Sequence, residues 1–121
     1  MLEINAETQS IFLTRGDTGY IDVIPEVKDE KTGLYVTRKL DEGDKMIFRM
    51  KVGSEILEKE CEMDYDNNMG HLVFTKNDTK DLEYKTYFYE VELVTIADEN
   101  FTIVAFKKFT IGKEIEENVQ V

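Results

Sequence analysis

Cys61 and His71 could together form a Cys–His nucleophilic pair, because the chain contains one residue of each type. Such a pair needs a thiol with a lowered pKa and an imidazole within hydrogen-bond reach of that thiol. No local sequence signature supports either condition. Cys61 is in phase with Leu57 and Met63, which favours a small core residue, and His71 follows a turn, which favours a surface or rim position. A single histidine and a single cysteine also exclude a multi-histidine metal site and an intramolecular disulfide.

The segment Asp64–Gly70 resembles the start of a calcium loop, in which oxygen ligands occupy alternate positions. The likeness breaks down at Met69, which stands where a calcium loop has its turn glycine. It also breaks down at Thr75, which stands where a bidentate glutamate closes the ligand shell. We therefore expect a hairpin tip with asparagine and glycine in left-handed conformations. Weak calcium binding at millimolar concentration is the alternative hypothesis.

The tripeptide Arg15-Gly16-Asp17 is the sequence that integrins bind on extracellular loops. The structural interpretation is a turn between the first two strands. In that turn Gly16 has a positive φ angle and the Asp17 side chain hydrogen-bonds its own backbone. We favour the turn, because matches of three residues arise by chance.

Carboxylates dominate the charge of the chain, since 26 Asp and Glu against 15 Lys and Arg give a formal net charge of −11. This charge repels nucleic acid, so no nucleic-acid partner is expected. Nothing in the sequence selects a glycosidase-like pair among so many carboxylates. We expect no catalytic, cofactor-binding or metal-binding residues. The solvated side of an edge strand and its turn explains the acidic run Glu55, Glu58, Glu60, Glu62, Asp64 and Asp66.

Alternation with a period of two is the main structural signal in the chain. From Lys45 to Val52 apolar residues alternate with mostly cationic ones, and Tyr87–Val94 repeats the pattern with aromatic and β-branched residues. One helical turn is expected at 78–82, where Asp78 could cap the amides that follow it. Shorter candidate strands are 10–14, 18–24, 35–38, 56–63, 72–75, 101–106 and 108–111, separated by turn signals at 15–17, 31–33, 41–44, 66–70 and 97–100.

These elements predict an all-β antiparallel sandwich of about seven to nine short strands, forming a single domain over residues 1–111. Residues 112–121 lose the pattern and are expected to form an acidic tail or connector. The longest strongly apolar stretch, 101–106, is far shorter than a membrane-spanning helix, so no membrane insertion is expected. The first residues lack a secretory signal, which predicts synthesis in the cytoplasm.

Tyr87 is placed near the start of the predicted penultimate strand. In sandwich folds a tyrosine at this position can hydrogen-bond back to the preceding corner and hold the crossing between sheets. We predict this role for Tyr87.

Several blocks of sequence, taken in order, resemble a known family. The blocks are Ile11–Thr18, Leu40–Lys51, Asp78–Leu82 leading into Tyr87–Leu93, and Phe109–Glu114. Their order and spacing resemble the immunoglobulin-like domain of tail and baseplate proteins from phages and prophages of Gram-positive bacteria, the type at the N-terminus of upper baseplate proteins. The resemblance implies an immunoglobulin-like β-sandwich that serves as a structural module of the virion tail, without catalytic residues.

We therefore expect a non-enzymatic assembly module that is made in the bacterial cytoplasm and incorporated into a virion tail. Its expected partners are other tail or baseplate proteins, or copies of itself, bound through sheet edges or loop ends. The alternative is a carbohydrate- or host-surface-binding domain whose stacking platform consists of Tyr20, Tyr35, Tyr65 and Tyr84. A hydrolytic enzyme is the least favoured class, because no nucleophile–base signature is present.

Overall fold

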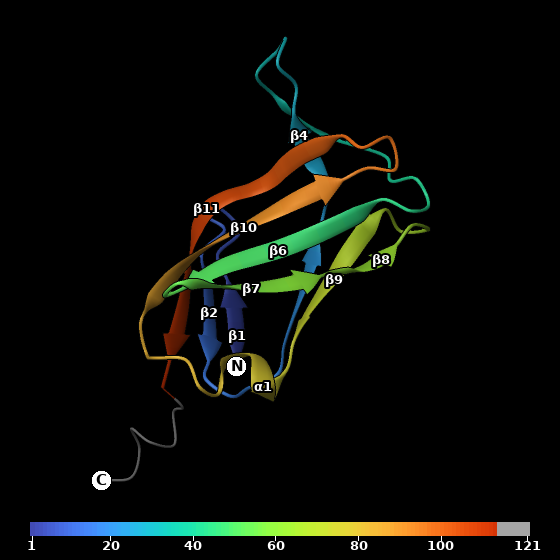
Figure 1. Ribbon diagram of the computed structural model, residues 1–121. Coiled ribbons are helices and arrows are strands. Elements are labelled where there is room, and N and C mark those ends of the chain that lie inside the picture. Colours follow the sequence, from blue (N-terminus) through green and yellow to red (C-terminus); the bar gives the residue numbers. More distant parts are fainter. Residues whose placement is uncertain (114–121) are drawn as a thin grey trace, which may run out of the picture.

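The computed structural model describes residues 1–113 of the 121-residue chain. These residues form eleven β-strands and one helical turn, arranged as shown in Figure 1. The helix is α1 (Lys76–Thr79). The strands are β1 (Leu2–Ile4), β2 (Ile11–Thr14), β3 (Gly19–Val23), β4 (Glu26–Lys28), β5 (Tyr35–Thr37), β6 (Lys45–Val52), β7 (Glu55–Glu60), β8 (Glu62–Asp64), β9 (Met69–Phe74), β10 (Thr86–Val94) and β11 (Asn100–Gly112).

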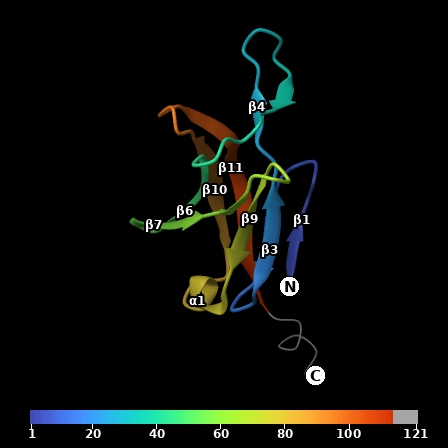
Figure 2. The same cartoon turned by 90° about the vertical axis from the view of Figure 1, so that its right-hand side faces the viewer.

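Two sheets pack face to face, which confirms the predicted all-β sandwich. The larger sheet has the strand order β1-β2-β11-β10-β6-β7, and the smaller sheet has the order β3-β9-β8. Figure 2 shows the two layers from the side, with the β4–β5 hairpin projecting from one end. All pairs are antiparallel except β2 and β11, which run parallel.

The alternation of β6 and β10 arises because each strand buries one face. Met46, Phe48 and Met50 of β6 are buried, whereas Ile47 and the cationic residues Lys45, Arg49 and Lys51 point away from the core. The centre of the core is aromatic. Phe74 of the smaller sheet packs with ring centroids 5.2 Å from Phe48 and 5.3 Å from Phe109 of the larger sheet, both edge to face. Burial of each such side chain stabilises the fold by about 2–3 kcal/mol, so these rings hold the two layers together.

The predicted strand 56–63 divides at Cys61. The amide of Cys61 donates to the carbonyl of Met46 at 2.9 Å, which keeps β7 in the larger sheet. The next residues, β8, pair with β9 in the smaller sheet. Cys61 is therefore the point at which the chain crosses between layers. β7 is an edge strand, as the acidic run predicted.

The strand count also exceeds the prediction because β1 and β4, each three residues long, were not predicted. One difference lowers the count. The predicted strands 101–106 and 108–111 are joined in the single strand β11, whose pairing with β10 contains register shifts.

A helical turn is present, but it begins two residues before the predicted range 78–82, and the capping prediction was wrong. Thr75 is the N-cap residue of α1, and the Asp78 carboxylate accepts a 2.7 Å hydrogen bond from the Thr75 amide that precedes it. Asp78 therefore sits at the third helical position and reaches backwards, as in a capping box. Its carboxylate also lies 2.7 Å from Lys59 Nζ of β7, which joins α1 to the edge of the larger sheet.

Strand β11 ends at Gly112, so the predicted tail 112–121 overlaps the last residue of that strand. The remainder of the predicted tail, 114–121, lies outside the described residues. Across residues 1–113, none of the helical structure is long and apolar enough to span a bilayer.

Candidate functional site

The structure does not form the Cys61–His71 pair. Cys61 is 7% exposed and packs in the core, as predicted. Burial raises the pKa of its thiol to about 11, so the thiol is protonated at neutral pH. Both ring nitrogens of His71 instead contact carboxylates on the outer side of the smaller sheet. A protonated thiol without a neighbouring base is a poor nucleophile.

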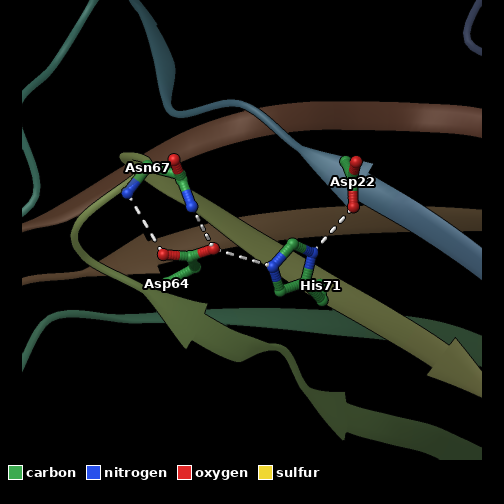
Figure 3. Close-up of polar contacts among 4 residues, drawn as sticks. All are labelled: Asp22, Asp64, Asn67 and His71. Atoms are coloured by element: carbon green, nitrogen blue, oxygen red, sulfur yellow. Dashed lines mark hydrogen bonds and ion pairs between the residues drawn. The ribbon is translucent and has the colours of Figure 1, made fainter.

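His71 lies between two carboxylates that come from different strands (Figure 3). Its Nδ1 is 2.7 Å from Asp22 Oδ1 of β3, and its Nε2 is 3.2 Å from Asp64 Oδ2 of β8. Hydrogen bonding to Asp22 and then to Asp64 raises the pKa of His71 above its usual value. The ring of Tyr20 stacks on the imidazole at 5.6 Å. This cluster can hold a proton and tie three strands together.

Asp64 is also the first residue of the suspected calcium loop. The backbone amide and side-chain amide of Asn67 donate to its carboxylate at 3.1 and 2.9 Å, and these bonds lower the pKa of Asp64. The loop is a hairpin tip that joins β8 to β9, with Asn68 at φ 56°. Within residues 1–113 there is no group of three or more His, Cys, Asp or Glu side chains arranged to hold a metal ion.

The Arg15-Gly16-Asp17 turn is anchored to the region around α1. Gly16 has φ 81°, as predicted, and its amide donates to the buried hydroxyl of Thr79 at 2.8 Å. The Arg15 guanidinium lies 3.9 Å from the ring centroid of Tyr84. The prediction for Asp17 was wrong in one respect, because its carboxylate pairs with the amino group of Met1.

Tyr87 has the contact predicted for it. The side chain is 5% exposed, and its hydroxyl donates to the carbonyl of Glu83 at 3.2 Å. Glu83 lies in the segment that connects α1 to β10. The bond therefore fixes this corner.

The four tyrosines of the suspected stacking platform occupy four local environments. Tyr20 stacks on His71, and Tyr35 is exposed on the β4–β5 hairpin. The Tyr65 hydroxyl donates to the carbonyl of Asp44 at 2.8 Å, and Tyr84 lies beneath Arg15. Tyr20 therefore lies on β3, Tyr35 on the β4–β5 hairpin, Tyr65 in the β8–β9 tip and Tyr84 after α1, and each of the four belongs to a different part of the fold.

Strand β11 offers an unpaired backbone edge. On one side β10 pairs with it from Asn100 to Thr110. On the other side β2 pairs only with Phe109–Gly112, because β2 is four residues long. Within the described chain, residues 101–108 have no strand partner on that second side. Unpaired amides and carbonyls of this kind can bind an added strand.

A cavity of about 780 Å³ opens beside this edge, between β11 and β3. Its walls include Ile103 and Val104 of β11 and Ile21 and Val23 of β3. The loop between β1 and β2 borders the cavity and is fixed by the Tyr89 hydroxyl, which donates to the carbonyl of Gln9 at 2.6 Å. Burial raises the pKa of Tyr89 to about 12. A cavity of this volume with apolar walls can accept side chains of a bound segment.

The opposite face of β11 carries a second hollow, which we call the outer-face groove. Its volume is about 520 Å³, and it crosses the outer face of the larger sheet. Its lining includes Phe106 of β11, Phe88 of β10, Ile56 of β7, and the cations Arg49, Lys51 and Lys85.

Sequence reasoning missed Asp22, Phe88 and Phe106. Asp22 meets His71 only through pairing of β3 with β9, across 49 residues of sequence. Phe106 carried one weak signal, because the predicted strands 101–106 and 108–111 were interrupted just after it. The interruption corresponds to the register shift between Tyr89 and Val91 in the β10–β11 pairing.

Comparisons of the chain with known protein-family models, with curated proteins and with solved structures give no match.

Proposed function

We propose that the chain is a non-enzymatic assembly module, and that it binds a partner by strand addition to the unpaired edge of β11. The observation that supports this proposal is the coincidence of two features at one place. Residues 101–108 lack a second strand partner within the described chain, and the 780 Å³ cavity opens beside them. An added strand would gain backbone hydrogen bonds from the edge and would place alternate side chains in the cavity.

The edge is recessed as well as unpaired. The loop between β1 and β2 borders one part of the cavity, and the β4–β5 hairpin contributes Glu26, Lys28 and Tyr35 to its lining. A strand docked between these two elements would be enclosed on both sides. This geometry supports a specific partner segment, because an open edge alone pairs with many chains.

The assignment to a phage or prophage tail rests on the resemblance of the sequence blocks to baseplate domains. The immunoglobulin-like topology and the location in the virion belong to the same proposal. The partners would then be other tail or baseplate proteins, or further copies of this chain. A carbohydrate-binding function receives less support, because Tyr20, Tyr35, Tyr65 and Tyr84 lie in separate environments.

The test places a bulky charge at the edge without altering the core. Ala105 is exposed and lines the cavity, so Ala105→Arg should block an added strand while leaving the fold intact. Ala97→Arg is the matched control, because Ala97 is an exposed alanine in the turn between β10 and β11. Size-exclusion chromatography with light scattering would measure self-association and binding to purified products of neighbouring tail and baseplate genes.

We expect the wild-type chain and Ala97→Arg to form the complex, and Ala105→Arg to lose it. A wild-type chain that stays monomeric and binds none of these proteins would overturn the assembly proposal. Equal binding by Ala105→Arg would show that the complex forms elsewhere on the surface.

A further inference from the structure

The β4–β5 hairpin has no sheet partner within the part of the chain that the structure describes. It forms a two-stranded sheet of its own and projects past one end of the sandwich, as Figure 1 and Figure 2 show. A two-stranded hairpin by itself is only marginally stable in water. Because β5 pairs with β4 alone, the other edge of β5 keeps unpaired amides and carbonyls, as the edge of β11 does.

The hairpin also exposes an uninterrupted run of apolar side chains. Leu34, Tyr35 and Val36 are 66%, 64% and 49% exposed. Side chains alternate along a strand, so Leu34 and Val36 share one face. Tyr35 lies on the other face, opposite Lys28, and lines the cavity of its own chain. Three consecutive exposed apolar residues are unfavourable in water unless a partner covers them.

We propose that the occupant of the β11 edge and its cavity is the β4–β5 hairpin of a second copy, exchanged reciprocally between two chains. This inference rests on the proposed function and names the partner for it. β5 of the second copy would pair with the unpaired edge of β11, and its Leu34 and Val36 would enter the cavity. The cavity walls are apolar at Ile21, Ile103 and Val104.

The position of the hairpin sets the orientation of this pairing. Arg38 at the base of the hairpin lies 3.3 Å from Glu99 in the turn before β11, so the hairpin projects from the end at which β11 begins. A second hairpin that enters the cavity from this end points its tip along the direction of β11. Because β5 leads away from the tip, it would run antiparallel to β11.

The charge of the hairpin tip complements the cavity in this orientation. The tip carries Asp29 and Glu30 against one cation, Lys31. It would lie near Lys107, which lines the cavity towards the far end of the unpaired edge. Within residues 1–113 neither Glu30 nor Lys107 has an ion pair, so both are available for a pair between copies.

The lengths of the arm and the edge agree as well. From residue 26 to residue 31 the arm would extend about 20 Å at 3.3 Å per residue. The unpaired edge, residues 101–108, extends about 26 Å by the same measure. A docked arm therefore fits within the edge.

Two-fold symmetry gives this contact the size of a stable interface. Each hairpin borders the cavity of its own chain through Glu26, Lys28 and Tyr35, so both contacts of a two-fold dimer can form beside one axis. One hairpin, residues 26–37, is smaller than the roughly 20–30 residues a side that a stable interface contains. A hairpin and a cavity wall from each copy together reach that size.

The first test measures the dimer by size-exclusion chromatography with light scattering over a range of concentrations. The wild-type chain should form a dimer that dissociates on dilution. Leu34→Ser combined with Val36→Ser removes the side chains that enter the second cavity and should leave a monomer, as should Ala105→Arg. The matched control is Phe88→Ser with Phe106→Ser, at residues 51% and 76% exposed in the outer-face groove, and it should keep the dimer.

A cross-link identifies the two surfaces without relying on a loss of binding. A chain with Leu34→Cys, mixed with a chain with Ala105→Cys under mild oxidation, should form a disulfide-linked dimer. Ile96→Cys is the control for Leu34→Cys, because Ile96 is 65% exposed in the turn between β10 and β11, and it should give no cross-link to Ala105→Cys. The native Cys61 is buried, so the wild-type chain should also give none.

Charge reversal tests the orientation. Glu30→Lys alone, or Lys107→Glu alone, should weaken the dimer roughly five-fold, because each two-fold dimer contains the pair twice. Both changes in one chain should restore the affinity. A doubly reversed chain that dimerises as weakly as the single variants would overturn the antiparallel pairing.

The outcomes separate this inference from the proposed function. A wild-type chain that stays monomeric, but binds a neighbouring tail protein through a contact that Ala105→Arg abolishes, would overturn the inference and leave the proposed strand addition intact. A dimer that is lost in Ala105→Arg and kept in Leu34→Ser with Val36→Ser would also overturn it, because another segment would then fill the cavity. A dimer that survives Ala105→Arg would overturn it as well, since the contact would lie elsewhere.

Discussion

His71 Nδ1 lies 2.7 Å from Asp22 Oδ1, and this contact joins β9 to β3 on the outer side of the smaller sheet. The second ring nitrogen faces Asp64 of β8 at 3.2 Å. A protonated imidazole can donate to both carboxylates, whereas a neutral one can donate to only one of them. Both contacts together therefore require a charged His71, and we expect the link among the three strands of the smaller sheet to depend on pH.

The first prediction concerns this link. Because the pKa of His71 is raised in the folded chain, its contribution to stability is complete below the unfolded value of 6.5 and is lost as pH rises through the folded pKa. We expect His71→Gln to lower the melting temperature relative to wild type more at about pH 5.5 than at about pH 8.5. An NMR titration of the wild-type imidazole should give a pKa above 6.5, and Asp22→Asn should lower it. A wild-type pKa at or below 6.5 would contradict the prediction.

The second prediction concerns the corner before β10. Tyr87→Phe removes the 3.2 Å hydrogen bond to the Glu83 carbonyl and should lower the free energy of unfolding by about 1 kcal/mol. Urea unfolding measures this change. Tyr35→Phe is the control, because Tyr35 is exposed on the hairpin and should leave the midpoint unchanged. An unaltered midpoint in Tyr87→Phe would mean that the hydroxyl does not fix the corner.

The third prediction concerns the link between α1 and β7. Burial favours the neutral form of Asp78, but hydrogen bonds from Lys59 and Thr75 outweigh it, and the pKa of Asp78 is lowered. Asp78→Asn should therefore destabilise the fold by about 1–2 kcal/mol at neutral pH. This difference is present above the unfolded pKa of 3.8 and should disappear as pH falls through the lower folded value. Unfolding curves at several acidic pH values test the prediction, and a pH-independent difference would refute the ionic origin.

The fourth prediction concerns Cys61. Its pKa of about 11 and its burial leave little thiolate at about pH 8, so the native chain should react slowly with a thiol-specific disulfide reagent. The same chain in denaturant should react fully, with the signal of one thiol. Rapid labelling of the native chain would contradict the buried position.

The fifth prediction concerns the hairpin tip at Asp64–Gly70. The carboxylate of Asp64 accepts hydrogen bonds from Asn67 and faces His71, so a calcium ion would have to displace these partners. Calorimetry with millimolar calcium should show no binding heat, and the melting temperature should not change. A saturable heat that is lost in Asp64→Asn would support the alternative hypothesis of a weak calcium site.

The sequence by itself determined the strands that bury one face. The alternation in Lys45–Val52 predicts β6, and the alternation in Tyr87–Val94 predicts most of β10, because burial on one side requires an apolar residue at every second position. The same phase identified Cys61 as a core residue, and the position of Tyr87 indicated its corner contact. These features depend on neighbours within a few residues along the chain.

Tertiary structure decided which strands meet and where the edges are left open. β1 and β4 are too short to produce a periodic signal, and they form only through pairing with β2 and β5. The contact of Asp22 with His71, the open edge of β11 where β2 ends, and the outward position of Phe106 all depend on register between distant segments. A local pattern specifies which face of a strand is buried, but it carries no information about the strand beside it, because pairing is a contact between residues far apart in sequence.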